Sequence, residues 1–339
     1  MRVFLYEWIT GGGLVDQTGQ LPASMLREGA AMLSALAADF AALPDCEVTV
    51  LRDMRLSGPA LPHCRIVEVH SSEHWREEFD QHVSQSDASL VVAPEFDGIL
   101  RDTLRRAADA GAGVLNSGDE FVAIASNKQR TAERLGAAGL RTPEAVLLDA
   151  DQETLPTDFE YPGVLKPIDG AGSQHMLKVE GPLDEPPPYP WPRRLERFYP
   201  GKPASVSLLC GGGRRTALPP CWQHLSADGR FTYLGGALIR DKFLAQRARA
   251  LAIQAADAMP PAAGYVGVDV VLGAAADGSD DVVIEVNPRL TTSYIGLRAA
   301  VKQNLVQAML DCAAGRDVQV TVEDWCVEFA ADGTRRSLA

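Results

Sequence analysis

The sequence lacks closely spaced cysteines, apolar runs long enough to cross a bilayer and an excess of positive charge. Each of these shortages argues against one class of protein. Its six cysteines show no CxxC or comparable spacing, which argues against a zinc ribbon or disulfide framework and for reduced, mostly buried thiols. Apolar runs such as AAMLSALAADFAAL fall well short of the roughly 20 residues that cross a bilayer, and no basic segment followed by an apolar one opens the chain. We therefore expect a cytoplasmic location and no membrane partner.

Positive charge is the third shortage. The net charge of -13 opposes binding to a phosphate backbone, and the basic cluster PRRLER at 192–197 is too short to overturn it, so no nucleic-acid partner is expected. With 339 residues, 46 % of them hydrophobic, the chain can form roughly two domains of about 150 residues. The composition therefore predicts a soluble globular protein.

Two common phosphate-binding loops are also missing. No GxxxxGK[ST] occurs, and Gly11, Gly12 and Gly13 are followed by Leu14, so this glycine run does not form GxGxxG. The run is therefore a weak phosphate candidate, although it follows a strand-like segment.

The first 115 residues alternate strand-like and helix-like segments. Helical patterns cover 24–43 and 99–112, and strand candidates are RVFLYEW, CEVTVLRD, CRIVEVH, ASLVVAPE and GVLNS. This alternation predicts a parallel, doubly wound sheet, in which ligands collect at the carboxyl ends of the strands. Glu7 to Gly13 and Glu95 to Asp97 are expected at such ends.

From Ser117 the pattern changes. A helix is expected to end near Gly139, and YPGVLKPIDGAGSQHMLKV reads as strand, glycine loop, strand. After a proline-rich connector, RRLERFYPGKPASVSLLC is expected to resume a strand, and a β-hairpin and a closing helix follow. We expect three units with boundaries at 1–116, 117–195 and 196–335.

The hairpin carries the most informative pattern. Side chains on a strand alternate with period two, so Glu285 and Asn287 must share a face. A hairpin that pivots on Asp277 places Asp269 opposite Glu285 and Gly267 opposite Asn287. The three oxygen donors Asp269, Glu285 and Asn287 would then converge on a hard cation, most often Mg²⁺.

A solvent-facing strand with two unpaired acids is the alternative to this metal site. Ile284 and Val286 flank Glu285, and VVIEVNP lacks the polar alternation of a solvated face. A carboxylate on a mostly apolar strand needs a metal or a cationic partner to offset its desolvation, so the metal interpretation is favoured.

Lys166 lies inside an apolar strand and is followed by the loop DGAGS. Burying an ammonium group without a partner is costly, so an anion is expected near it, and glycines let backbone N–H groups approach phosphate oxygens. Lys128 could supply a second cation. The alternatives are a lysine that reaches solvent from an edge strand, for Lys166, and an exposed helix lysine, for Lys128.

A rival hypothesis from a different class is metal binding by a sensor or structural protein. His70, His74, Glu78 and His82 fall at four-residue steps, so one helical face could present ligands, although an exposed charged helix has the same pattern.

The order and approximate spacing of Lys128, Lys166 with DGAGS, LERFYPG, GVD and IEVNPR resemble those of the ATP-grasp superfamily over about residues 117–312. The resemblance implies an α/β N-terminal parallel-sheet domain followed by α+β ATP-grasp subdomains that hold ATP between them, with Mg²⁺ (or Mn²⁺). The hinge departs from the common pattern because no acidic residue follows Gly201, which leaves the usual contact with the ribose open.

The resemblance also implies roles for particular residues. ATP would be bound by two lysines, the glycine loop and a hinge against adenine: Lys128, Lys166, Asp169, Gly170, Gly172, Ser173, Glu196, Arg197 and Phe198. The metal ligands would be Asp269, Glu285 and Asn287, and the catalytic cations Lys166 and Arg289. Arg240 is a second candidate clamp for phosphate or carboxylate, with a surface arginine as the alternative.

At a finer level, YEWITGGG, APEFDGIL and NPRLTTSYIGL look like the tyramine–glutamate ligase family of methanofuran biosynthesis and its bacterial counterparts in one-carbon metabolism. Glu7, Gly11, Gly12, Gly13 and Glu95 would then contact the small substrates. The resemblance implies an ADP-forming carboxylate–amine ligase that acts through an acyl phosphate and joins glutamate to tyramine or tyrosine. A ligase for other amino acids, a kinase and a homo-oligomer remain open.

Overall fold

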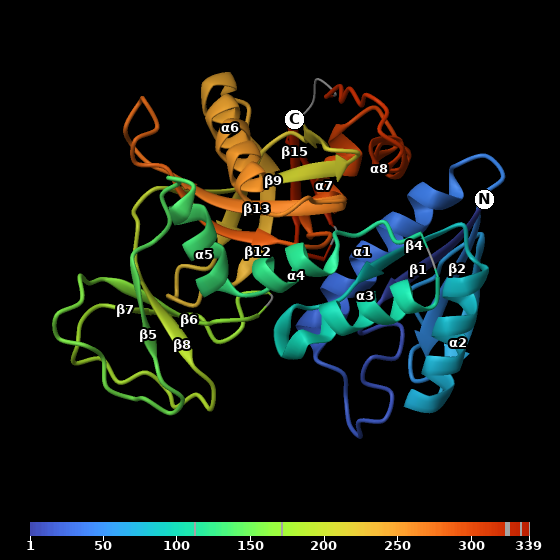
Figure 1. The fold of residues 1–339 in the computed structure, drawn as a ribbon, viewed down its shortest axis with the longest axis horizontal. Coiled ribbons are helices and arrows are strands. Elements are labelled where there is room, and N and C mark those ends of the chain that lie inside the picture. The colour runs from blue at the N-terminus through green and yellow to red at the C-terminus, as the bar shows by residue number, and fades with distance from the viewer. Residues whose placement is uncertain (112, 171, 323–325, 333, 339) are drawn as a thin grey trace.

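The computed structural model describes residues 1–111, 113–170, 172–322, 326–332 and 334–338, which form three β-sheets with flanking helices (Figure 1). The first sheet lies on the right of the view, the second at the lower left, and the third between and above them. Among the described residues, every helix is too short or too polar to cross a bilayer.

The first sheet is parallel throughout, as predicted. Its order is β3-β2-β1-β4, with β1 (Arg2–Glu7), β2 (Glu47–Asp53), β3 (Cys64–Val69) and β4 (Ala88–Val92). The flanking helices are α1 (Ala23–Ala41), α2 (Ser72–Gln85), η1 (Phe96–Gly98) and α3 (Ile99–Asp109). The prediction of a strand over GVLNS is wrong, because Val114 makes only an isolated bridge to Ser89.

The second sheet is antiparallel, and helices α4 (Asp119–Ala125) and α5 (Lys128–Ala137) precede it. Its order is β5-β8-β6-β7, with β5 (Ala145–Leu148), β6 (Gly163–Pro167), β7 (Leu177–Val179) and β8 (Arg193–Arg197). It has a small core of its own, made by Leu148, Leu155, Leu165, Val179 and Leu195.

The segment RRLERFYPGKPASVSLLC forms two strands in different sheets rather than one. Strand β8 ends at Arg197 in the second sheet, and β9 (Lys202–Gly211) begins the third after Pro200 and Gly201. Proline has no backbone N–H to continue the ladder, which explains the break. The boundary expected after residue 195 therefore falls inside β8.

The third sheet is antiparallel, with order β14-β13-β9-β11-β12-β15-β16 and with β10 paired to β9. Its other strands are β10 (Arg214–Ala217), β11 (Cys221–Leu225), β12 (Tyr233–Leu238), β13 (Gly264–Leu272), β14 (Val282–Asn287), β15 (Cys326–Ala330) and β16 (Arg335–Leu338). The accompanying helices are α6 (Lys242–Ala258), α7 (Ser293–Ala300) and α8 (Leu305–Ala313). Helix α6 buries an alanine face against this sheet.

The first unit shares a hydrophobic core with the third sheet, because α1 packs on α7 and α8. A polar contact fixes the same interface: the Asp39 carboxylate on α1 accepts hydrogen bonds from the Tyr294 hydroxyl (2.5 Å) and the Arg298 guanidinium. The expected fold class, a parallel α/β unit followed by antiparallel α+β units, is confirmed.

Candidate active site

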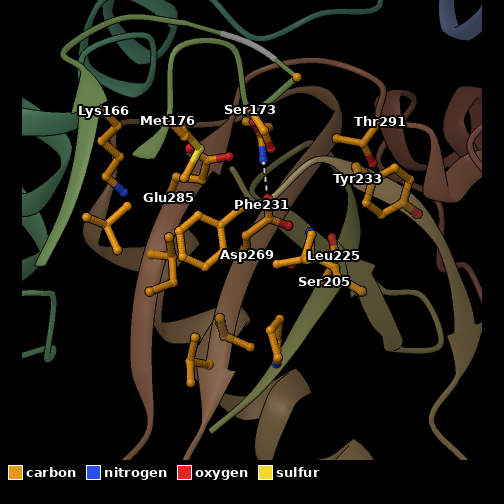
Figure 2. Close-up of a pocket in the computed structure, with 18 of the residues that line it drawn as sticks. Lys166, Ser173, Met176, Ser205, Leu225, Phe231, Tyr233, Asp269, Glu285 and Thr291 are labelled. Atoms are coloured by element: carbon orange, nitrogen blue, oxygen red, sulfur yellow. Dashed lines mark hydrogen bonds between the residues drawn. The ribbon is translucent and has the colours of Figure 1, made fainter. Parts of the chain in front are cut away.

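One cavity of about 330 Å³ lies where the second and third sheets face each other (Figure 2). Its walls come mainly from β6, β8, the β11–β12 hairpin and the β13–β14 pair, and Glu28 of α1 reaches it from the first unit. Most of the candidate residues from the sequence lie in or beside this cavity.

Strands β13 and β14 hold the three oxygen donors on one face. Asp269 pairs with Glu285 and Gly267 with Asn287, which confirms the predicted register, and a bulge after Asp269 shifts the remaining pairs by one residue. The Asn287 amide donates to the Asp269 carboxylate (3.2 Å). The space beside Gly267 is filled by Thr291, since a Cβ there would lie 2.8 Å from its methyl group.

The two carboxylates of this face differ in their tendency to ionise. Burial and the neighbouring Glu285 charge raise the pKa of Asp269 to about 7. Burial also opposes ionisation of Glu285, but the charges of Lys128 and Lys166 outweigh it, and its pKa falls below the usual value. The pair therefore lacks the positive charge needed to keep both groups ionised.

This donor set fits a hard divalent cation. Two carboxylates and an amide oxygen are the ligands such ions take, and a bound cation would offset the repulsion between Asp269 and Glu285. The solvent-facing alternative is wrong, because both carboxylates line the cavity and are half-buried, and Lys128 lies 3.4 Å from Glu285.

Lys166 is 1 % exposed, and its strand β6 lies between β7 and β8, so the edge-strand alternative is wrong. Its Nζ atom lies 2.5 Å from Oε2 of Glu196, whose other oxygen accepts a hydrogen bond from Arg194 Nε (2.7 Å). The protein itself therefore supplies the anion that burial of this ammonium group requires. A phosphate would be a second anionic partner.

Lys128 begins helix α5, whose N-cap is the Asn127 side chain. Its Nζ atom donates to the Gly170 carbonyl (3.1 Å) and lies 3.4 Å from Glu285 Oε2. The side chain is 11 % exposed, so the exposed-lysine alternative is wrong.

The glycine loop between β6 and β7 turns through backbone conformations that favour glycine. Gly170, Gly172 and Ser173 have φ values of 146°, 66° and 58°, and the last two line the cavity. The Asp169 carboxylate accepts a hydrogen bond from the Asp97 backbone N–H (3.1 Å), so it faces the first unit rather than the cavity.

One region of the cavity is apolar and aromatic. It is lined by Val164, Met176, Phe198, Phe231 and Ile284, and the rings of Phe198 and Phe231 stack at 6.3 Å. Such a surface suits a flat base.

The three residues of the expected hinge, 196–198, line the cavity. The Glu196 side chain is bound to Lys166 and Arg194, and the Phe198 N–H donates to the Pro162 carbonyl (2.8 Å). Neither the Glu196 carboxylate nor the Phe198 N–H is free for a base, so what this segment offers is the apolar surface of Phe198.

Arg289 follows β14 and also lines the cavity. Its Nε atom lies 2.9 Å from Glu95 Oε1, and its Nη1 atom donates to the Leu290 carbonyl (3.1 Å). Burial opposes its charge, but the charges of Glu95, Glu285 and Glu28 outweigh burial and raise its pKa. A guanidinium that keeps its charge in this position can bind a carboxylate or phosphate.

Glu7 and the GGG run have structural partners instead of a place on the cavity wall. Glu7 accepts hydrogen bonds from the Thr10 N–H (2.8 Å) and hydroxyl (2.6 Å), and a Cβ at Gly29 would lie 2.5 Å from its carboxylate. A Cβ on Gly11 would lie 2.7 Å from the Tyr6 ring. A Cβ on Gly12 would contact the Val69 side chain, and one on Gly13 would contact the Trp8 ring. Close packing accounts for these glycines, and neither they nor Glu7 are among the residues that line the cavity, so their substrate role stays a prediction.

Two further expectations need correction. Arg240 is exposed and does not line the cavity, so the surface alternative describes it.

Glu78 bridges His74 and His82 at 3.4 and 3.2 Å on helix α2, and the described ranges contain no group of three or more His, Cys, Asp or Glu side chains placed to hold a metal ion. The metal-sensor hypothesis therefore loses its ligand set.

The sequence did not identify several lining residues. Phe231 and Tyr233 belong to the β11–β12 hairpin, which no pattern in the sequence marked, and Glu28 lies within an ordinary amphipathic helix. The hydroxyl run Thr291, Thr292 and Ser293 also lines the cavity, and its position one residue after Asn-Pro-Arg was a signal from which the sequence could have identified it.

Two family models match the chain: a pre ATP-grasp 3 domain over residues 46–122 and an ATP-grasp domain over residues 125–293. Two curated relatives are tyramine–L-glutamate ligases. The one from Methanocaldococcus fervens is 23 % identical over 325 residues, which are 95 % of this chain and 97 % of the relative. The one from Methanocaldococcus jannaschii is 24 % identical over 324 residues, which are 95 % of this chain and 92 % of the relative.

Solved structures show the same fold. An ATP-grasp superfamily protein from Archaeoglobus fulgidus superimposes with a TM-score of 0.71 at 23 % identity, covering 97 % of this chain and 92 % of that protein. An L-amino acid ligase from Bacillus licheniformis superimposes with a TM-score of 0.62 at 18 % identity, covering 92 % of this chain and 73 % of that protein.

Proposed function

We propose that this chain, which belongs to the ATP-grasp superfamily and is an ATP-dependent, amide-bond-forming ligase, joins glutamate to tyramine or tyrosine through an acyl-phosphate intermediate. The substrates and the pathway, biosynthesis of a one-carbon carrier of the methanofuran type, rest on the resemblance to the tyramine–L-glutamate ligases. The mechanism below rests on the cavity.

The observation that carries the proposal is the convergence of opposite charges from distant segments. Lys166 on β6 and the pair Asp269 and Glu285 line one cavity, Lys128 contacts Glu285, and part of the same lining is apolar. Cations for phosphates, oxygen donors for a metal and an apolar surface for a base are together what a metal–ATP complex requires.

The reaction has two steps, transfer of a phosphoryl group to the acid and transfer of the acyl group to the amine. A carboxylate oxygen of the acid attacks the γ-phosphorus of ATP, and ADP leaves. The amine nitrogen then attacks the acyl carbon, phosphate departs with the former carboxylate oxygen, and the ammonium proton passes to a base or to water. A divalent cation held by Asp269, Glu285 and Asn287 would neutralise charge on the phosphate oxygens.

The chain's own residues position the reactants and offset charge. Lys166 and Lys128 would contact the phosphates, and Arg289 would face the acyl phosphate, where the guanidinium matches two oxygens at once. Gly170, Gly172 and Ser173 would cover the phosphates and exclude water, which protects the intermediate from hydrolysis.

The test is ADP release by the purified chain with ATP, Mg²⁺ and one acid–amine pair at a time, combined with product mass. The proposal predicts ADP release and an amide of glutamate with tyramine or tyrosine. ADP release with acid alone and no amide would indicate a kinase. An amide of other amino acids would keep the ligase and change its substrates, and absence of ADP release with every pair would refute the function.

A further inference from the structure

Glu28 is the feature of the cavity that the mechanism leaves unused. Of the described residues that line the cavity, it alone comes from the first unit, where it lies in the second turn of helix α1. Its side chain is half-buried, and within the described parts of the chain it has no hydrogen bond or ion pair. Its carboxylate is therefore available to a ligand.

The surroundings of Glu28 have an excess of negative charge. Arg289 is the nearby cation, but its guanidinium already pairs with Glu95 at 2.9 Å, and Glu285 also acts on it. Arg27, the residue before Glu28, is exposed and lines a different groove on α1. A positively charged group of a substrate is what this end of the cavity lacks.

The kind of cation follows from the reaction. An amine that attacks an acyl phosphate must first lose its proton, whereas a carboxylate beside it stabilises the protonated form. A permanent carboxylate partner therefore suits an ammonium group that takes no part in bond formation. An α-amino acid that supplies the reacting carboxylate carries such a group.

We propose that Glu28 binds the unreactive ammonium group of the acid substrate, which makes that substrate an amino acid rather than a simple carboxylic acid. This inference rests on the proposed function. It also makes Glu28 a specificity-determining residue: it would strengthen binding of the correct acid without taking part in phosphoryl transfer.

The test compares acids that differ only in the ammonium group, L-glutamate with glutarate and L-aspartate with succinate. Binding is measured by calorimetry with the Mg²⁺ complex of a non-hydrolysable ATP analogue. A charge-assisted hydrogen bond predicts that the wild type binds at least one amino acid about tenfold to a hundredfold more tightly than its deaminated partner. Glu28→Gln should reduce that ratio to near one, and Glu28→Asp should retain part of it.

The matched control is Glu77→Gln, the same substitution at an exposed position of helix α2 in the same unit, which should keep the wild-type ratio. Equal binding of both partners by the wild type, or an unchanged ratio in Glu28→Gln, would overturn the inference. So would a fall in kcat with every acid at an unchanged ratio, which would indicate a base. The proposed function fails separately, if no acid–amine pair releases ADP from the wild type.

Discussion

The Nζ atom of Lys128 lies 3.4 Å from Oε2 of Glu285 and 3.1 Å from the carbonyl oxygen of Gly170. One side chain at the start of α5 thus joins the glycine loop of the second sheet to the carboxylate face of the third. A nucleotide between these sheets would meet Lys128 at the point where both walls converge.

Lys128→Met removes this charge and keeps most of the side-chain volume. We expect ATP affinity to fall about tenfold to a hundredfold, the usual effect of losing one charged hydrogen bond. Equilibrium binding of a fluorescent ATP analogue provides the measurement. Lys242→Met is the matched control, because Lys242 also begins a helix behind a capping residue but is exposed. Equal affinities for the two variants would count against a phosphate role.

Glu285→Gln removes the ionised carboxylate of the pair with Asp269 and leaves the shape of the strand intact. Because a hard cation prefers charged oxygen ligands, Mn²⁺ affinity in the presence of the ATP analogue should fall at least about tenfold. Electron paramagnetic resonance of free Mn²⁺ follows the binding. Asp277→Asn, in the exposed turn of the same hairpin, should bind Mn²⁺ as the wild type does. A Glu285→Gln protein with wild-type affinity would exclude Glu285 as a ligand.

Glu7→Gln tests the interpretation of Glu7 as a buried structural carboxylate. Burial raises its pKa from 4.5 to about 7, with the hydrogen bonds from Thr10 and Ile9 and the charge of Arg289 opposing the shift. Between these values the folded protein binds the extra proton, so the free energy of unfolding falls as pH rises from about 4.5 through 7. The loss is on the order of 3 kcal/mol.

Urea unfolding of the wild type and Glu7→Gln between pH 5 and 8 measures this difference directly. The variant should gain stability relative to the wild type as pH rises. Other groups that titrate in this range, including Asp269, are present in both proteins and cancel in the comparison. A difference that does not change with pH would contradict the assignment.

Gly13→Ala tests whether the GGG run packs or binds. A Cβ at this position would lie 2.1 Å from Nε1 of Trp8, so we expect a loss of about 1–3 kcal/mol from overpacking. Denaturant unfolding measures the loss, and Gly136→Ala gives a comparison at an exposed glycine where an added Cβ meets nothing within 4 Å. ATP affinity of the folded Gly13→Ala protein should equal that of the wild type. A normal stability with weakened ATP binding would return the run to the phosphate site.

The sequence predicts the carboxylate face well because that face depends on local rules. Period-two alternation places Glu285 and Asn287 on one face, and the pairs of Asp269 with Glu285 and Gly267 with Asn287 are as expected, although a bulge after Asp269 shifts the pairs nearer the turn by one residue. The parallel first sheet follows in the same way from the alternation of strands and helices.

What the sequence could not provide depends on contacts between distant segments. The partner of Lys166 is Glu196, which becomes visible only when β8 lies beside β6. The packing of the GGG run against Tyr6 and Trp8, and the opening of Glu28 into the cavity, likewise depend on how elements meet. Arg240 follows a strand that no pattern marked, so its exposure could not be predicted.

The most direct test of the account is a crystal structure with Mn²⁺ and a non-hydrolysable ATP analogue, read by the anomalous signal of the metal. The account predicts Mn²⁺ bound by Asp269, Glu285 and Asn287, with the phosphates between it and Lys128 and Lys166. A metal or triphosphate bound elsewhere, with these five side chains in contact with neither, would contradict it.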